Sequence, residues 1–178
     1  MGESAYEEFE EYTTCLLEIS ASKGDHEDCA LSDVVEKVEF VTYSTYTSKT
    51  LVERFYEAYS IPVVVLGKNT DHWDWYSKVD LVLHFLQTLK KRKQYLLVTD
   101  ATDIALTRCP DSLIERFSAY DASVVFCNTV ADWPPCRELY NFETIRYPEH
   151  PLHAHLSAGG YFGRAQKVLE YLERLEKA

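Results

Sequence analysis

The sequence predicts an α/β domain whose mainly parallel sheet is covered by helices on both faces. Short apolar runs alternate with helical patterns from residue 38 onward, and this alternation is typical of parallel strands joined by helical crossovers. The length of 178 residues fits one compact core, since domains of roughly 100–200 residues are the ordinary case. We therefore expect a single domain over 1–178, with a helix and loop over 1–33 and the core over 38–178.

Four strands are expected from short apolar runs rich in β-branched residues. These runs cover residues 38–42, 61–66, 95–99 and 123–127. Gly67 closes the second run, where a glycine lets the backbone turn. By contrast, residues 129–160 have little regular periodicity, and a long segment of this kind usually lines a site.

Apolar residues at helical spacing predict four helices in the core. The helices cover residues 51–59, 77 to about 91, 110–120 and 164–175, the last entered through Gly159 and Gly160. Thr50 and Glu53 have the spacing of a capping box at the start of the first helix. The basic run over 90–93 is expected at a helix end, because cations suit the C-terminal end of the helix dipole.

The N-terminal segment predicts a further helix over 3–19, which extends the core. Its apolar positions include Tyr6, Phe9 and Tyr12, and its outer face is strongly acidic. Residues 20–33 are small, polar and charged, which is typical of a loop. Two interpretations stay open for the aromatic stripe, namely packing against the sheet and docking to a protein partner.

The composition bounds the possible partners and compartment. Apolar residues make up 46% of the chain, enough for a core, and the formal net charge is −11. Because nucleic-acid binding needs a basic surface, DNA and RNA are disfavoured as partners. The N-terminus has no basic, apolar leader, and no run of about 18 apolar residues occurs. We therefore expect a soluble, cytoplasmic protein that does not enter a membrane.

The cysteines do not form a recognisable framework. There are five of them, and none is paired in a CxxC spacing, which favours neither a zinc site nor a set of disulfides. Cys127 and Cys136 flank the segment expected to line a site. We interpret both as small buried residues.

The strongest chemical signal follows the predicted strand over 95–99. Asp100 and Asp103 stand three residues apart, so their side chains can converge only if the chain turns between them. Such a turn would lie at the carboxyl end of a parallel strand, where open α/β sheets bind ligands. Two convergent carboxylates there suit Mg²⁺ or Mn²⁺, which would neutralise a diphosphate. The alternative is equally open: Asp100 ends the strand and Asp103 caps a local turn.

Other catalytic patterns are weaker. A phosphatase with an aspartate nucleophile needs its second acid two residues further on, and Thr102 stands there. Neither GxGxxG nor GxxxxGK[ST] occurs. His153 and His155 lie on the same side of an extended segment, so either could be an additional metal ligand. The alternative is that both are polar loop residues near Pro151.

Seven segments of the chain stand in a recognisable order. They include FVTYST at 40–45, LVTDATD at 97–103 and LSAGGYFG at 156–163, with shorter matches at 65–67, 78–79, 125–127 and 133–134. In this order the chain, from about residue 38 to 172, resembles the glycosyltransferase domain of the procollagen lysyl hydroxylase and glycosyltransferase family. The resemblance implies a GT-A fold, which is Rossmann-like, together with a UDP-sugar donor and Mn²⁺ or Mg²⁺.

The resemblance also implies roles for particular residues. Asp100 and Asp103 would ligate the metal, and Lys78 would contact a phosphate or the nucleotide. Further nucleotide contacts are implied for Thr42, Tyr43 and Ser44, and a sugar or acceptor pocket for Trp133 and for Ser157 to Gly160, including Gly159.

Two departures from the family keep two functions open. The family normally has Asn where this chain has Ser157, and it continues to an acidic cluster and a histidine that completes the metal shell, whereas this sequence ends at Ala178. The first hypothesis is a metal-dependent glycosyltransferase that transfers a sugar from a UDP-sugar to a hydroxyl acceptor. The second is a truncated, non-catalytic binding or assembly domain of the same fold.

Overall fold

The structure, a computed structural model, describes residues 31–68, 70, 73–74, 76–102, 104, 110–129 and 155–177. The helix expected over 3–19 and most of the loop expected over 20–33 lie outside these residues. Among the described helices, none is long and apolar enough to cross a membrane.

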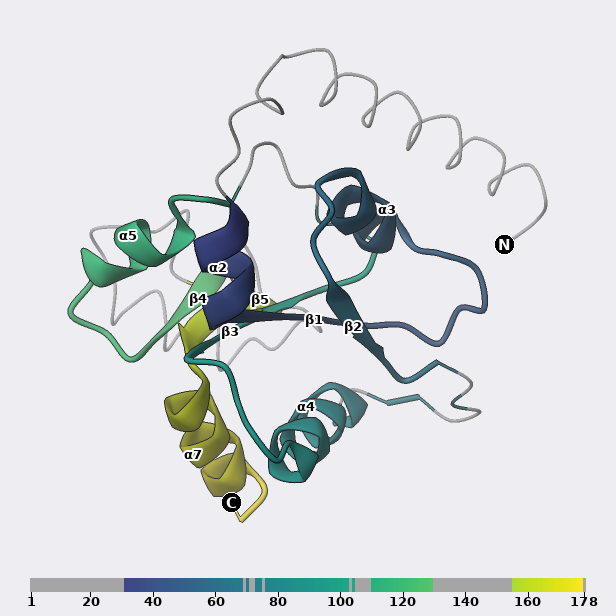
Figure 1. The fold of residues 1–178 in the computed structure, drawn as a ribbon. Coiled ribbons are helices and arrows are strands. Elements are labelled where there is room, and N and C mark those ends of the chain that lie inside the picture. Colours follow the sequence, from purple (N-terminus) through teal and green to yellow (C-terminus); the bar gives the residue numbers. More distant parts are fainter. Residues whose placement is uncertain are drawn as a thin grey trace.

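The described strands form one five-stranded sheet in the order β2-β1-β3-β5-β4 (Figure 1). The strands are β1 (Val38–Tyr43), β2 (Val63–Leu66), β3 (Tyr95–Thr99), β4 (Val124–Thr129) and β5 (His155–Arg164). Strand β1 pairs in parallel with β2 and β3, whereas β5 lies antiparallel between β3 and β4. The prediction of an α/β fold flanked by helices is confirmed, and its sheet is mixed and partly parallel.

Strand β5 corrects the expectation for the segment 129–160. Its first residues, including Gly159 and Gly160, are not the entrance to the last helix but part of a strand that pairs with β3. Its last glycine, Gly163, permits close pairing with β4, because a Cβ at this position would lie 2.8 Å from the carbonyl oxygen of Ser123. The glycines that obscure the strand in the sequence are thus part of how it packs.

Helices cover both faces of the sheet (Figure 1). Three lie on one face, namely α2 (Leu31–Lys37), α3 (Leu51–Ala58) and α5 (Leu113–Ser118), and two lie on the other, namely α4 (Ser77–Thr88) and α7 (Ala165–Leu175). Helix α2 begins inside the range expected to be a loop, so that part of the prediction is wrong. Helices α4 and α5 are shorter than predicted, and α7 matches closely.

The two cores follow from the alternation of side chains along the strands. In β1, Val38 and Phe40 pack toward α2 and α3, while Val41 and Tyr43 pack toward α4 and α7. The first three of these side chains are fully buried, and burial of each such side chain contributes about 1.5–3 kcal/mol. Hydrophobic contacts on both faces therefore fix the position of the strand ends.

Local signals behave as the sequence predicts at two helix ends. The backbone N–H of Thr50 donates to Glu53 Oε2 at 2.9 Å, and the backbone N–H of Glu53 donates to Thr50 Oγ1 at 3.4 Å, which confirms the capping box. The basic run over 90–93 follows the end of α4, where Arg92 Nε donates to the carbonyl oxygen of Leu86 at 2.7 Å. The run therefore supplies a hydrogen-bond donor to a carbonyl group near the end of the helix, as expected.

Candidate functional site

The site is built at the edge of the sheet where the parallel strands end. Strand β3 ends at Thr99 and Asp100 follows it. Because β5 runs antiparallel to β3, its early residues lie at the same edge, and Asp100 N–H donates to the carbonyl oxygen of Gly159 at 2.7 Å. Two sequence segments predicted to share a site are thereby brought into contact.

Asp100 forms an ion pair with Lys78, which lies in the first turn of α4. Lys78 Nζ is 2.7 Å from Asp100 Oδ1, and the two side chains are 21% and 18% exposed, respectively. Lys78 Nζ also lies 4.9 Å from the centre of the Tyr43 ring, within the range of a cation–π contact. Three residues predicted from the family resemblance therefore share one partly buried cluster.

Gly159 allows the Asp100 carboxylate to approach the backbone of β5. A Cβ at position 159 would lie 3.0 Å from Asp100 Oδ2 and 3.2 Å from Ser157 Oγ. The Gly159 N–H donates to that same Ser157 Oγ at 3.2 Å. Any larger residue at 159 would therefore press on the carboxylate of Asp100 and on the hydroxyl of Ser157.

The Asp100 carboxylate and the Ser157 hydroxyl are hard oxygen donors, which fit Mg²⁺ or Mn²⁺. Within the described residues, no group of three or more His, Cys, Asp or Glu side chains gathers around one point. The second predicted ligand, Asp103, lies outside the described residues, as does His153. His155 is part of β5, but its side chain is also outside the description. The metal roles of these residues therefore stay predictions.

Thr42 and Ser44 use their side chains inside the protein. Thr42 is fully buried, and its Oγ1 donates to the carbonyl oxygen of Thr99 at 2.8 Å. Ser44 is 4% exposed, and its Oγ accepts from the backbone N–H of Tyr46 at 3.1 Å. These hydroxyls support the ends of β3 and β1, respectively, and the nucleotide contacts implied for Thr42 and Ser44 stay predictions.

Aromatic residues flank the lysine. The Trp73 ring lies 5.9 Å from the Tyr43 ring at an interplanar angle of 40°, and Trp73 is 37% exposed. Gly67, with φ of +81°, turns the chain beside Trp73, a conformation that favours glycine. Trp133, predicted to line the sugar or acceptor pocket, lies outside the described residues.

Cys127 lies next to the site, and the prediction of its burial is wrong. It was expected to be buried, but it is a free, exposed cysteine. A Cβ at Gly160 would lie 2.9 Å from its Sγ. Although the residue as a whole is exposed, partial burial of its sulfur raises the pKa of the Cys127 thiol, and the nearby Asp100 carboxylate raises it further. The thiol is therefore close enough to the site to sense its charge.

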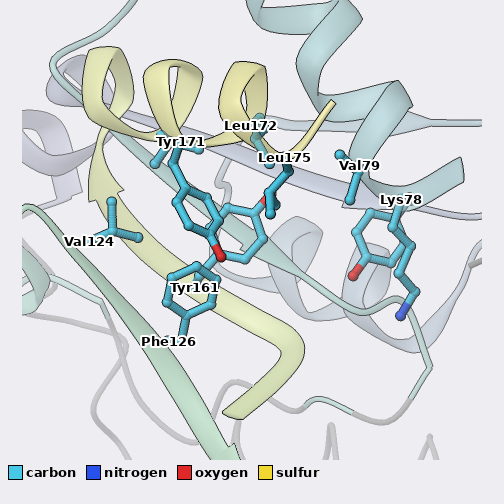
Figure 2. A pocket seen from close by; sticks show the side chains of 10 residues that line it. Lys78, Val79, Val124, Phe126, Tyr161, Tyr171, Leu172 and Leu175 are labelled. Carbon is cyan, nitrogen blue, oxygen red and sulfur yellow. The ribbon is translucent and has the colours of Figure 1, made fainter. Parts of the chain in front are cut away.

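An apolar cavity of about 230 Å³ adjoins the polar cluster (Figure 2). Phe126, Tyr161 and Tyr171 lie toward its α7 end, and Lys78 and Val79 toward its α4 end (Figure 2). Burial, with a smaller effect from Tyr171, raises the pKa of Tyr161, so this hydroxyl stays neutral near pH 7. The cavity is thus an apolar chamber whose polar end is the lysine that pairs with Asp100.

The fold and this edge define an α/β domain whose charged and glycine residues gather beyond the carboxyl ends of its parallel strands, the usual ligand-binding place in such sheets. The sequence model of the family described as the PLOD GT domain matches residues 35–178. The chain belongs to this family and is therefore a glycosyltransferase-family domain. The family resemblance inferred from the motifs is confirmed. No curated protein matches the chain.

Proposed function

We propose that this chain binds a UDP-sugar together with Mn²⁺ or Mg²⁺ at the Asp100 edge and transfers the sugar to a hydroxyl acceptor. The observation that carries the proposal is the arrangement of Lys78, Asp100 and Gly159 in a glycosyltransferase-family domain. A cation, a carboxylate and a close backbone approach are what a metal–diphosphate site requires of the protein.

The chain's own residues would hold and orient the donor. Asp100 Oδ2 and Ser157 Oγ would hold the metal, and Lys78 would contribute a positive charge toward the diphosphate. The Tyr43 ring supports Lys78 through a cation–π contact. The bound metal would neutralise the negative charge that develops on the departing nucleotide.

Residues Ser157 to Gly160 would face the sugar, because they lie beside Asp100 on the neighbouring strand. A glycosyltransferase domain must bind both a sugar donor and an acceptor, so the acceptor hydroxyl would approach from this same edge. Trp133 stays a prediction for the sugar or acceptor pocket, and the cavity behind Lys78 gives an apolar wall on the α7 side.

The experiment is a screen of UDP-hexoses for release of UDP with Mn²⁺ present, in the wild type and in two variants. Asp100→Ala removes the proposed ligand, whereas Asp80→Ala removes an exposed carboxylate from α4 and serves as the control. We expect Mn²⁺-dependent release in the wild type and in Asp80→Ala, and its loss in a folded Asp100→Ala. Equal release by Asp100→Ala would contradict the proposal.

The competing function is a non-catalytic binding or assembly domain, docking through the helix predicted over 3–19. Nothing in the described residues favours it, because that helix lies outside them. The two functions separate on nucleotide binding. A folded wild-type protein that binds no UDP with or without Mn²⁺ would favour the assembly domain, and Mn²⁺-dependent binding would favour the transferase.

A further inference from the structure

We propose that Lys78 is an exchangeable cation: it pairs with Asp100 until metal and nucleotide arrive, and it then moves to the diphosphate. This inference rests on the proposed function but concerns a separate property. It predicts that Lys78 opposes the binding of metal alone and favours the binding of nucleotide with metal, two effects of opposite sign from one side chain.

The first step concerns the oxygen that Lys78 occupies. Lys78 Nζ lies 2.7 Å from Asp100 Oδ1, and about four-fifths of each side chain is shielded from water. Two cations on one carboxylate repel each other, and shielding from solvent strengthens that repulsion. A divalent cation on Asp100 is therefore in competition with the ammonium group.

The second step concerns which of the two side chains, Asp100 or Lys78, can move. Its Oδ2 lies against Gly159 and its Oδ1 is bound by Lys78, so the carboxylate is held between β5 and α4. The lysine, in contrast, has a flexible four-carbon stem. When the metal ion and the Lys78 ammonium group cannot both bind Asp100, the ammonium group is the one that moves.

The third step concerns where the ammonium goes. Lys78 Nζ lies over the Tyr43 ring, 4.9 Å from its centre, and the ring face attracts a cation in this position whether or not Asp100 is its partner. The Tyr43 ring therefore keeps the ammonium at the strand edge after it leaves Asp100. A diphosphate bound at that edge offers the ammonium group a negatively charged partner in place of Asp100.

A purely structural ion pair makes a different prediction. If the pair only fastens α4 to β3, its loss lowers stability and changes metal and nucleotide affinity in the same direction or not at all. The chain offers a matched control, because Lys68 pairs with Glu53 at 3.1 Å with comparable exposure, 26% and 12%.

The experiment measures Mn²⁺ binding alone by the electron paramagnetic resonance signal of free Mn²⁺, and then UDP binding at fixed Mn²⁺ by calorimetry. The proteins are the wild type, Lys78→Met, Lys78→Arg and Lys68→Met. We expect Lys78→Met to bind Mn²⁺ about fivefold more tightly and UDP about fivefold more weakly. A fivefold change in affinity corresponds to the interaction free energy of one partly shielded ion pair. Lys78→Arg keeps a competing cation and should resemble the wild type in Mn²⁺ binding, as should Lys68→Met.

Unchanged or weaker Mn²⁺ binding by a folded Lys78→Met overturns the exchange, and so does the absence of Mn²⁺ binding in every protein. If Lys78→Met does not fold, Lys78→Gln is measured in its place against the same thresholds. Tighter Mn²⁺ binding without any UDP binding would keep the competition at Asp100 and would refute the proposed function instead, so the two failures are distinguishable.

Discussion

Two lysine–carboxylate pairs lie at the same edge of the sheet and have similar burial, yet they differ in what surrounds the carboxylate. Glu53 Oε2 accepts from the Thr50 backbone N–H at 2.9 Å, from Thr50 Oγ1 at 3.0 Å and from Lys68 Nζ at 3.1 Å. Burial alone would raise the pKa of Glu53, but these hydrogen bonds outweigh it and hold the pKa below its ordinary value. One oxygen of this carboxylate therefore accepts three hydrogen bonds within the fold.

Asp100 is held more sparsely. Among the described residues, its side chain takes part in one hydrogen-bonded ion pair, with Lys78 at 2.7 Å, while Oδ2 faces Gly159. The fold brings a lysine to each carboxylate, but only Glu53 is also surrounded by donors of its own helix end. The comparison teaches that the carboxylate with fewer hydrogen bonds from the described residues, Asp100, is the one suited to bind a ligand.

The largest expected effect is the difference between isosteric substitutions of the two carboxylates, Asp100 and Glu53, in UDP binding and stability. Asp100→Asn should weaken Mn²⁺-dependent UDP binding by about 100-fold or more, since loss of even an outer-shell partner costs about 10- to 100-fold. Its midpoint of urea unfolding should stay close to that of the wild type. Glu53→Gln should do the reverse, with unchanged UDP affinity and a loss of about 1 kcal/mol in stability. Calorimetric and urea titrations of both variants check this, and the same profile in both would break the comparison.

The next effect distinguishes the roles of two glycines in β5, Gly163 and Gly159. Gly163→Ala places a Cβ 2.8 Å from the Ser123 carbonyl oxygen and 3.0 Å from Val124 Cα, both backbone atoms, and should cost about 1–3 kcal/mol of unfolding free energy. Gly159→Ala meets the side-chain oxygens of Asp100 and Ser157 instead of backbone atoms. It should cost less stability but weaken UDP binding about tenfold. Thermal unfolding and calorimetry decide, and a larger stability loss in Gly159→Ala would contradict the assignment.

A smaller effect is the acid dependence of the Glu53 pair. Because the folded-state pKa lies below the ordinary 4.5, its stabilisation is complete above that pH and is lost as the pH falls through the lowered pKa. The wild-type urea midpoint should therefore fall more steeply below pH 4.5 than that of Glu53→Gln. Glu57→Gln, which removes an exposed carboxylate from the same helix, is the control and should follow the wild type.

The smallest effect uses Cys127 as a sensor of the Asp100 charge. Asp100→Asn removes one of the two causes that raise the pKa of this thiol and leaves its burial. The pKa should fall, the thiolate fraction at pH 8 should rise, and alkylation of Cys127 should become about twofold faster. Peptide mass spectrometry resolves this cysteine from the others. An unchanged rate would show that the carboxylate does not act on the sulfur.

The fold was largely predictable where the signals are local. The apolar runs of β1 and β3, the spacing of Thr50 and Glu53, and the periodicity of α7 each depend on neighbouring residues and are found as expected. Strand β5 was missed because small residues and glycines make up much of its sequence. Its pairing partners, such as Thr99 for Gly160, are distant in the chain.

The site was predictable only where its signals are local. The position of Asp100 at a strand end follows from the sequence, but its pairing with Lys78, 22 residues away, depends on how α4 docks on the sheet. Thr42 and Ser44 give a second example, since only the packing reveals that each hydroxyl makes an internal hydrogen bond. Spacing identifies the edge, and tertiary contacts decide which of its side chains are available.

The most direct test of the central claim is a calorimetric titration of the wild-type chain with UDP, with and without Mn²⁺. The claim is that the edge around Asp100 is a metal-dependent nucleotide site, so UDP should bind with Mn²⁺ present and much more weakly when the metal is removed by a chelator. Equal binding with and without Mn²⁺, or no binding in either condition by a folded protein, would contradict it.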